Sequence, residues 1–166
     1  IYGGYSDVYK STNGGSTWSN MGVDGRGAMA IGTSNSSRVY ASSGTTIYMS
    51  DDAAATWTNV SAGLPGISIS YITVNPDNSF EVYVTLDGYT AGQKVYRSLN
   101  AGTTWTNISG TLPNVPANCI AFQDNNSSPA NAVYVGTDIG IFYRDANHTD
   151  WVPFRNGLPT VPVYDL

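Results

Sequence analysis

One eight-residue pattern recurs along the chain, and this repetition constrains the fold more than any other feature. The pattern begins with Ser, continues through polar and small residues, and ends in Thr-Trp. Three copies cover residues 11–18, 50–57 and 98–105, and a degraded copy covers residues 144–151. Their closing Trp residues are 39, 48 and 46 positions apart. Repeats of this length are typical of units of four short strands.

The sequence around each copy repeats in the same register. Short aromatic-containing runs typical of strands lie directly before the copies, at residues 7–10, 46–49, 94–97 and 140–143. A second run precedes each of these, at residues 1–4, 38–41, 81–84 and 132–135. A Leu-Pro turn follows three of the copies. Each unit therefore predicts an inner strand, two middle strands, a hairpin at the motif and an outer strand starting at Thr-Trp.

The composition favours an all-β chain. Charged residues make up only 11% of the sequence, with Glu81 as its one Glu and Lys10 and Lys94 as its two Lys residues. Solvated surface helices need many more such side chains at helical spacing. Short runs of Tyr, Thr, Val and Ile broken by Gly, Asn, Asp and Pro indicate strands and turns instead.

The repeated motif resembles the Asp-box consensus Ser-x-Asp-x-Gly-x-Thr-Trp of BNR-repeat β-propellers, a group that includes sialidases, sortilin-type receptors and xyloglucanase-like glycosidases. Residues 134–151 and 156–159 are similar to secreted bacterial sortilin/xyloglucanase-like repeat proteins. The chain departs from the consensus at Asn13 and Asn100, which replace Asp, and at Ala54, which replaces Gly. The resemblance implies β-propeller blades, each a four-stranded antiparallel sheet.

We expect a single propeller region over residues 1–166. Its units are a partial blade at 1–22, three blades at 23–66, 67–114 and 115–160, and at 161–166 the first strand of a further or ring-closing blade. About three blades would be complete and one would be split between the termini. A four-bladed ring, a segment of a six- to eight-bladed propeller and a ring shared between chains all fit. We favour the segment, because the resemblance implies further blades and neither end of the chain looks like a natural terminus.

The motif residues are assigned a structural role. Asp or Asn in a tight turn accepts backbone N–H bonds, and Gly adopts left-handed conformations without a Cβ clash. We expect each Trp to pack between neighbouring blades. The residues so assigned are Ser11, Asn13, Gly15, Thr17, Trp18, Ser50, Asp52, Thr56, Trp57, Ser98, Asn100, Gly102, Thr104, Trp105 and Trp151.

The resemblance places candidate ligand contacts on the opposite face, in the loops between second and third strands and between blades. These loops carry Asp7, Asp87 and Asp138, and the longest also holds Tyr89, whose ring could stack on a sugar. For Asp138, in a Thr-Asp-x-Gly turn, we favour capping of its own turn, with ligand contact as the alternative.

The sequence assigns no catalytic residue outright. Glycosidases need two facing carboxylates, and Asp138 is the single candidate acid, since the resemblance places it at an acid-bearing strand end of xyloglucanase-like enzymes. Those enzymes form their cleft between two propellers, which this chain is too short to build. One His (His148) and one Cys (Cys119) cannot form a zinc site, so we expect no metal and no cofactor.

Charge and composition limit the partners. The net charge of −5 and scattered Lys and Arg residues argue against nucleic acid. No apolar run reaches the roughly 20 residues needed for membrane insertion. Scarce Lys with abundant Asn, Ser, Thr and Gly favours a secreted or cell-surface location. We therefore expect a module for glycan or protein recognition, bound to the remaining blades of the same or another chain. Part of a xyloglucanase-like glycoside hydrolase is the alternative.

Overall fold

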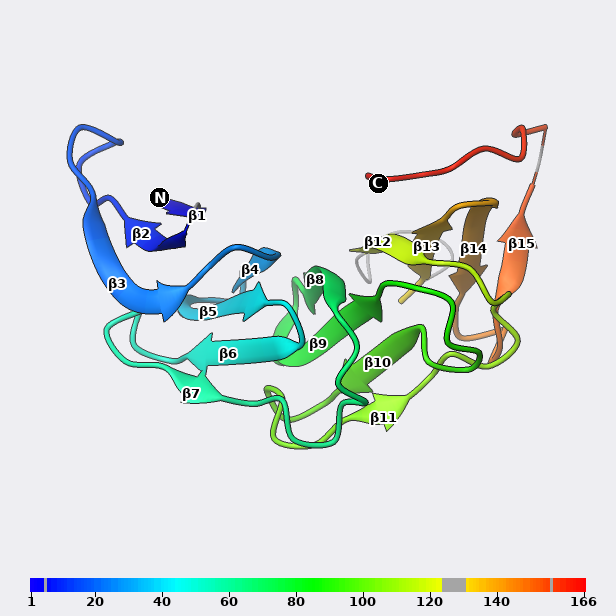
Figure 1. Ribbon diagram of the computed structural model, residues 1–166, viewed down its shortest axis with the longest axis horizontal. Helices are drawn as coiled ribbons and strands as arrows, with labels where there is room; N and C mark the ends of the chain where they lie inside the picture. Colours follow the sequence, from blue (N-terminus) through cyan, green and yellow to red (C-terminus); the bar gives the residue numbers. More distant parts are fainter. Residues whose placement is uncertain (5, 124–130, 156) are drawn as a thin grey trace.

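The protein is built from four antiparallel sheets that stand side by side along an open arc (Figure 1). The computed structural model describes residues 1–4, 6–123, 131–155 and 157–166, so Tyr5 and Asn156 of the segments noted above lie outside the described residues. The described residues form fifteen strands and no helix. The expectation of an all-β fold is confirmed. We number the sheets blades 1 to 4 in chain order.

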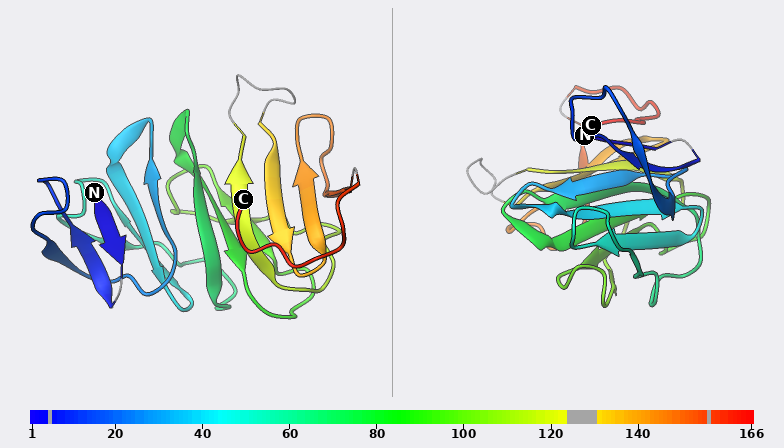
Figure 2. Two further views of the ribbon diagram at one scale, coloured as in Figure 1. Left: turned by 90° about the horizontal axis from the view of Figure 1, so that it is seen from above. Right: turned by 90° about the vertical axis from the view of Figure 1, so that its left-hand side faces the viewer.

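Each blade is a meander of consecutive strands (Figure 2). Blade 1 has three strands, β1 (Tyr2–Gly4), β2 (Asp7–Lys10) and β3 (Ser19–Asp24). Blade 2 consists of β4 (Met29–Gly32), β5 (Asn35–Ser43), β6 (Thr46–Ser50) and β7 (Thr58–Asn59). Blade 3 consists of β8 (Ile69–Asn75), β9 (Asn78–Leu86), β10 (Val95–Ser98) and β11 (Thr106–Asn107). Blade 4 consists of β12 (Ala117–Phe122), β13 (Val133–Thr137), β14 (Gly140–Arg144) and β15 (Val152–Phe154).

The strands fall where the repeated sequence predicts them. The two middle strands of every blade overlap the eight aromatic-containing runs, and each outer strand begins one residue after its Trp. The outer strand β3 continues to Asp24, two residues past the expected boundary of the first unit. Strands β4, β8 and β12 lie on the concave side of the arc, and β7, β11 and β15 lie toward its rim (Figure 1).

The hydrophobic cores lie between blades. Alternate strand residues face one neighbouring sheet each, as the two-residue period of a strand requires. One core joins blades 2 and 3 through side chains such as Tyr40, Ile72 and Leu86, and another joins blades 3 and 4 through Val95 and Ile120. Each fully buried Val, Ile or Leu stabilises the fold by roughly 1.5–3 kcal/mol. The arc is therefore held together by contacts between neighbours in sequence.

Three copies of the eight-residue motif form the same hydrogen-bond network. The first-position Ser hydroxyl accepts the fifth-position amide at 2.8 Å in each, with Gly15, Ala54 and Gly102 as donors. The side-chain oxygen of the third-position Asp or Asn accepts a hydrogen bond from the backbone amide of the seventh-position Thr at 2.8–2.9 Å. Asn therefore performs the hydrogen-bonding role that Asp performs in the second copy. The degraded copy forms a different turn, in which Asp145 accepts the amides of Asn147 and His148.

Three Trp side chains join neighbouring blades. The indole N–H groups of Trp57, Trp105 and Trp151 donate to backbone carbonyls of the preceding blade, at 3.1, 2.8 and 2.6 Å. The expectation that every motif Trp packs between blades is wrong for Trp18. This side chain is 45% exposed and donates to the Gly15 carbonyl of its own turn, because no blade precedes it in the structure.

The last segment does not form the predicted strand. Residues 161–166 have no ladder partner, and their backbone bond is from the Val163 amide to the Thr137 carbonyl at 3.0 Å. The segment runs from β15 back across the end of blade 4 toward the concave side (Figure 1). A strand needs a paired neighbour for successive amides and carbonyls, and the hydrogen bonds of this segment with the described strands β12 and β13 are confined to Val163.

Candidate functional site

The loop between β9 and β10 presents an aromatic ring on a firmly held base. Lys94 is fully buried and donates its Nζ proton to the Gly88 carbonyl at 2.7 Å. Burial lowers the pKa of Lys94, and the charge of Asp87 opposes this shift. Asn107 holds the far side of the loop through the Gly92 carbonyl at 2.7 Å. Tyr89, at the tip, is left 68% exposed.

The turn between β13 and β14 presents a carboxylate beside that ring. Thr137, not Asp138, caps this turn: its hydroxyl donates to the Gly140 carbonyl at 2.8 Å and accepts the Ile139 amide at 3.2 Å. The favoured interpretation of Asp138 as the turn cap is therefore wrong. Because Thr137 caps the turn, the Asp138 carboxylate is free to bond side chains of neighbouring elements.

Asp138 accepts hydrogen bonds from two side chains of other elements. Asn118 of β12 donates to one carboxylate oxygen at 3.0 Å, and the Tyr89 hydroxyl lies 3.5 Å from the other. Asn118 also donates to the Val163 carbonyl at 3.3 Å, so the last segment forms one edge of the cluster. An aromatic ring, a carboxylate and an amide from blades 3 and 4 thus meet at one face. We call Tyr89, Asn118 and Asp138 the loop-face cluster.

The last segment adds a second acid nearby. The Tyr71 hydroxyl on β8 donates to Asp165 at 3.4 Å. Burial, and next the charge of Asp165, raise the pKa of Tyr71. Asn118, Tyr71 and Asp165 were missed by sequence reasoning. Asn118 and Tyr71 sit within strands, where a polar or aromatic residue carries no signal of its own.

The other predicted acids lie apart or act locally. Asp87 accepts the amide of Gly88 at 2.6 Å, which is the capping role expected of an Asp in a tight turn. Asp7 lies on β2 of blade 1 and accepts the Asn20 amide group at 2.8 Å. The structure therefore brings together Tyr89 and Asp138, with Asp87 at the base of the same loop. Asp7 belongs to a separate blade.

The loop-face cluster has the chemistry of a polar recognition site. Its carboxylate and amide can bond sugar hydroxyls or peptide groups, and its ring offers an apolar face. Hydrolysis of a glycosidic bond needs two carboxyl groups across the scissile bond, about 5–9.5 Å apart. Within the described residues, the second acid noted above, Asp165, is bonded by the Tyr71 hydroxyl and by no member of the cluster. The same part of the chain holds no group of three or more His, Cys, Asp or Glu suited to a metal ion.

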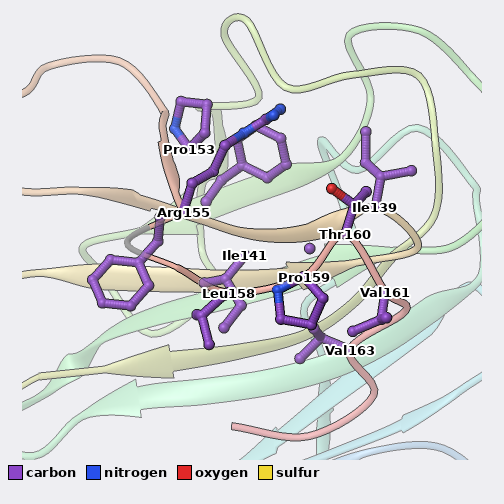
Figure 3. Close-up of a pocket in the computed structure, with 12 residues that line it drawn as sticks. Ile139, Ile141, Pro153, Arg155, Leu158, Pro159, Thr160, Val161 and Val163 are labelled. Atoms are coloured by element: carbon purple, nitrogen blue, oxygen red, sulfur yellow. The ribbon is translucent and has the colours of Figure 1, made fainter.

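An apolar groove of about 200 Å³ lies on the outward face of blade 4 (Figure 3). Ile141 and Phe154 line it from the sheet and Ile139 from the turn between β13 and β14, and the last segment covers it through Leu158 and Val161. Equivalent faces of blades 2 and 3 pack against the next blade. Among the described segments, none is a helix long and apolar enough to cross a membrane.

Solved structures with the same architecture fall in several protein classes. A GH74 enzyme from Niastella koreensis superimposes with a TM-score of 0.70 at 23% identity, over 93% of this chain and 22% of that one. The GH74 xyloglucanase from Xanthomonas campestris gives 0.69 at 13% identity, over 93% and 28%. YCF48 bound to D1 peptide gives 0.62 at 13% identity, over 93% and 50%.

No protein-family model matches the chain, and neither does any curated protein. The chain spans about a quarter of the GH74 structures and half of YCF48. Likeness at such low identity concerns the fold. Four consecutive antiparallel sheets arranged around a concave side, together with these neighbours, show that the chain has the β-propeller fold.

Proposed function

We propose that the protein is a recognition module whose ligand, a glycan, binds at the loop-face cluster. The observation that carries the proposal is the convergence of Tyr89, Asn118 and Asp138 from three separate elements. Aromatic rings stack on the apolar faces of sugars, and neighbouring carboxylate and amide groups bond the hydroxyls. Loops on a rigid sheet scaffold are the usual place for such sites.

Two further proposals concern the setting of the module. The motif networks support membership in the Asp-box, BNR-type propellers, because three copies form equal turns although Asn13, Ala54 and Asn100 depart from the consensus. The short coverage of the GH74 and YCF48 structures supports a segment of a larger propeller. Composition favours a secreted or cell-surface location.

A second function, part of a xyloglucanase-like hydrolase, has one observation in its favour. Asp138 is released from its turn and projects into the cluster, as a general acid would have to. This alternative requires a second carboxylate across the cleft. Because xyloglucanases are among the similar structures, xyloglucan oligosaccharides are the first glycan to test.

Replacement of the exposed ring tests the proposal. Tyr89→Ala is expected to weaken binding of xyloglucan oligosaccharides about tenfold, since an aromatic anchor typically contributes more than ~1 kcal/mol. Phe80→Ala removes another exposed ring, at the opposite end of β9, and serves as the matched control. Equal affinity of the wild type and Tyr89→Ala, by calorimetry, would refute the site. Release of reducing ends that Asp138→Asn abolishes would establish the hydrolase instead.

A further inference from the structure

The fourth motif copy departs from the repeat at its first position. The strand register pairs equivalent residues in each blade: Ser50 with Val39, Ser98 with Val82, and Arg144 with Val133. In the first three copies this Ser hydroxyl holds the motif turn. A guanidinium has no acceptor for that bond. Arg144 has therefore lost the structural role of this position, and departures from a local rule are expected at functional sites.

Arg144 is held in place, and, next to the hydrogen bond from the Thr111 amide, its charge helps to lower the pKa of Asp150 without a direct ion pair. Its guanidinium carbon lies 5.7 Å from the Trp151 ring centre, and one N–H group approaches the Ile108 carbonyl at 3.4 Å. It forms no ion pair with any residue in the described part of the chain. Most of its donors remain available for a ligand.

The guanidinium lines a polar cleft of about 400 Å³ between blades 3 and 4. The cleft opens at the motif end of the blades, whereas the loop-face cluster lies at the other end. Strand β14 starts beside Asp138 and ends at Arg144, so the two sites are separated by roughly 13 Å of strand. Arg97 and Glu81 of blade 3 and Asp145 and Asn131 of blade 4 share the lining.

The corresponding space between blades 2 and 3 is closed. There the Phe80 ring covers the Arg38 guanidinium at 3.9 Å, and Ser79 and Asp51 take its hydrogen bonds. In blade 4 the register places Asn131 where blade 3 has Phe80. The short amide leaves the cleft open.

The acid on the blade 3 side is already satisfied. Glu81 accepts bonds from Arg97, the Tyr83 hydroxyl and Asn75, at 2.8, 2.6 and 2.8 Å. Burial raises the pKa of Glu81, but the three donors outweigh burial and leave the pKa lowered. The Glu81–Arg97 pair is thus internally balanced. Arg144 is the guanidinium of this cleft that has no ion pair within the described residues.

We propose that this cleft binds a sugar acid, with its carboxylate on Arg144. A carboxylate accepts two parallel N–H bonds from one guanidinium, and this bidentate pair binds the Arg144 charge more strongly than a neutral acceptor would. Asn131, at the same opening, offers its amide to the ligand's hydroxyl groups, whereas the Asp145 side chain is 3% exposed and already bonded to His148 within its own turn. A cleft of this size holds one or two sugar rings.

Calorimetry with D-glucuronate tests the proposal, with D-glucose and acetate as comparison ligands. We expect glucuronate to bind more tightly than either one. Arg144→Ser restores the residue that the other three copies carry and should weaken glucuronate binding about tenfold or more. Arg155→Ser removes an exposed Arg outside this cleft and should leave the affinity unchanged.

Absence of glucuronate binding to the wild type would overturn the proposal, as would equal loss in both Arg variants. Equal binding of glucose would show that the carboxylate is not recognised. Tighter binding of acetate or of an Asp-Glu dipeptide would overturn the assignment to a sugar acid. Thermal unfolding of Arg144→Ser, expected to match the wild type, confirms that any loss arises in the cleft. Tyr89→Ala should bind glucuronate normally, so this site and the loop-face cluster can fail independently.

Discussion

The third residue of the repeated motif determines how each turn responds to pH. Hydrogen bonds from the Thr56 hydroxyl and amide, and from Ser50, lower the pKa of Asp52 from 3.8 to about 2. Because the pKa of Asp52 is lower in the folded state than in the unfolded state, its charged carboxylate stabilises the fold at pH values above the unfolded-state pKa of 3.8. This contribution is lost as the pH falls toward 2. Asn13 and Asn100 make the equivalent turns without a titrating group.

Asp52→Asn should therefore remove one pH-dependent contribution to stability. We expect the difference in melting temperature between wild type and variant to shift in favour of the variant as the pH falls from 3.8 toward 2. Thermal unfolding followed by circular dichroism over that range measures it. A difference independent of pH would contradict the assigned hydrogen bonds.

Single residues also mark the limit of sequence reasoning. The sequence predicted Tyr89 and Asp138 as candidate ligand contacts, and the structure brings the two side chains together, but the sequence gave Asp138 the capping role that Thr137 performs. Both Thr and Asp can cap such a turn, and only the fold decides between them. Arg144 was recognised as part of a degraded copy, yet its cleft depends on Asn131 and Arg97, which other elements bring beside it.

At the scale of elements, the fifth motif position controls the hairpin. Gly102 has a φ of +87°, and an added Cβ would lie 2.8 Å from Val60 Cγ2. Ala54 occupies the equivalent position with a φ of +70°, a conformation that is unfavourable for a residue with a Cβ. The second copy therefore carries strain that the third avoids.

Substituting Ala at position 102 and Gly at position 54 should affect the stability of the protein differently. Gly102→Ala is expected to destabilise the protein by about 1–3 kcal/mol through backbone strain and the clash with Val60. Ala54→Gly should leave stability unchanged or raise it by up to about 1 kcal/mol. Chemical denaturation gives both values. Destabilisation by Ala54→Gly equal to that of Gly102→Ala would show that conformation is not the controlling factor.

The strands themselves were readable from the sequence. The Tyr-centred runs and the Trp spacing located both middle strands of all four blades, because every unit repeats the same alternation. The segment 161–166 has an apolar alternation too, but it forms no ladder. Pairing depends on a neighbour, and a pattern within one segment does not supply it.

At the scale of the whole molecule, the arc repeats one contact between blades. Each motif Trp from the second copy onward donates to a carbonyl three residues after the previous motif Trp. Trp18 has no such acceptor among the described residues, and the Phe154 carbonyl occupies the position that would receive a following Trp. Within the described residues, blade 1 thus carries a motif Trp without an acceptor from a preceding blade, and blade 4 carries the acceptor without a following Trp.

The proposed larger propeller requires further blades in the native chain. Mass spectrometry of the protein from its source should give a chain heavier than 17.6 kDa. A native chain of that mass in a monomer would instead require a four-bladed ring, and in a dimer a ring shared between two chains. Either result would refute the larger propeller.

The central claim, recognition at the loop-face cluster, is tested most directly by nuclear magnetic resonance with isotope-labelled protein and xyloglucan oligosaccharides. We predict that ligand addition shifts the signals of Tyr89, Asn118 and Asp138, while those of the motif turns at Asp52 and Asn100 stay in place. Shifts confined to the motif turns, or no shifts at saturating oligosaccharide, would contradict the claim.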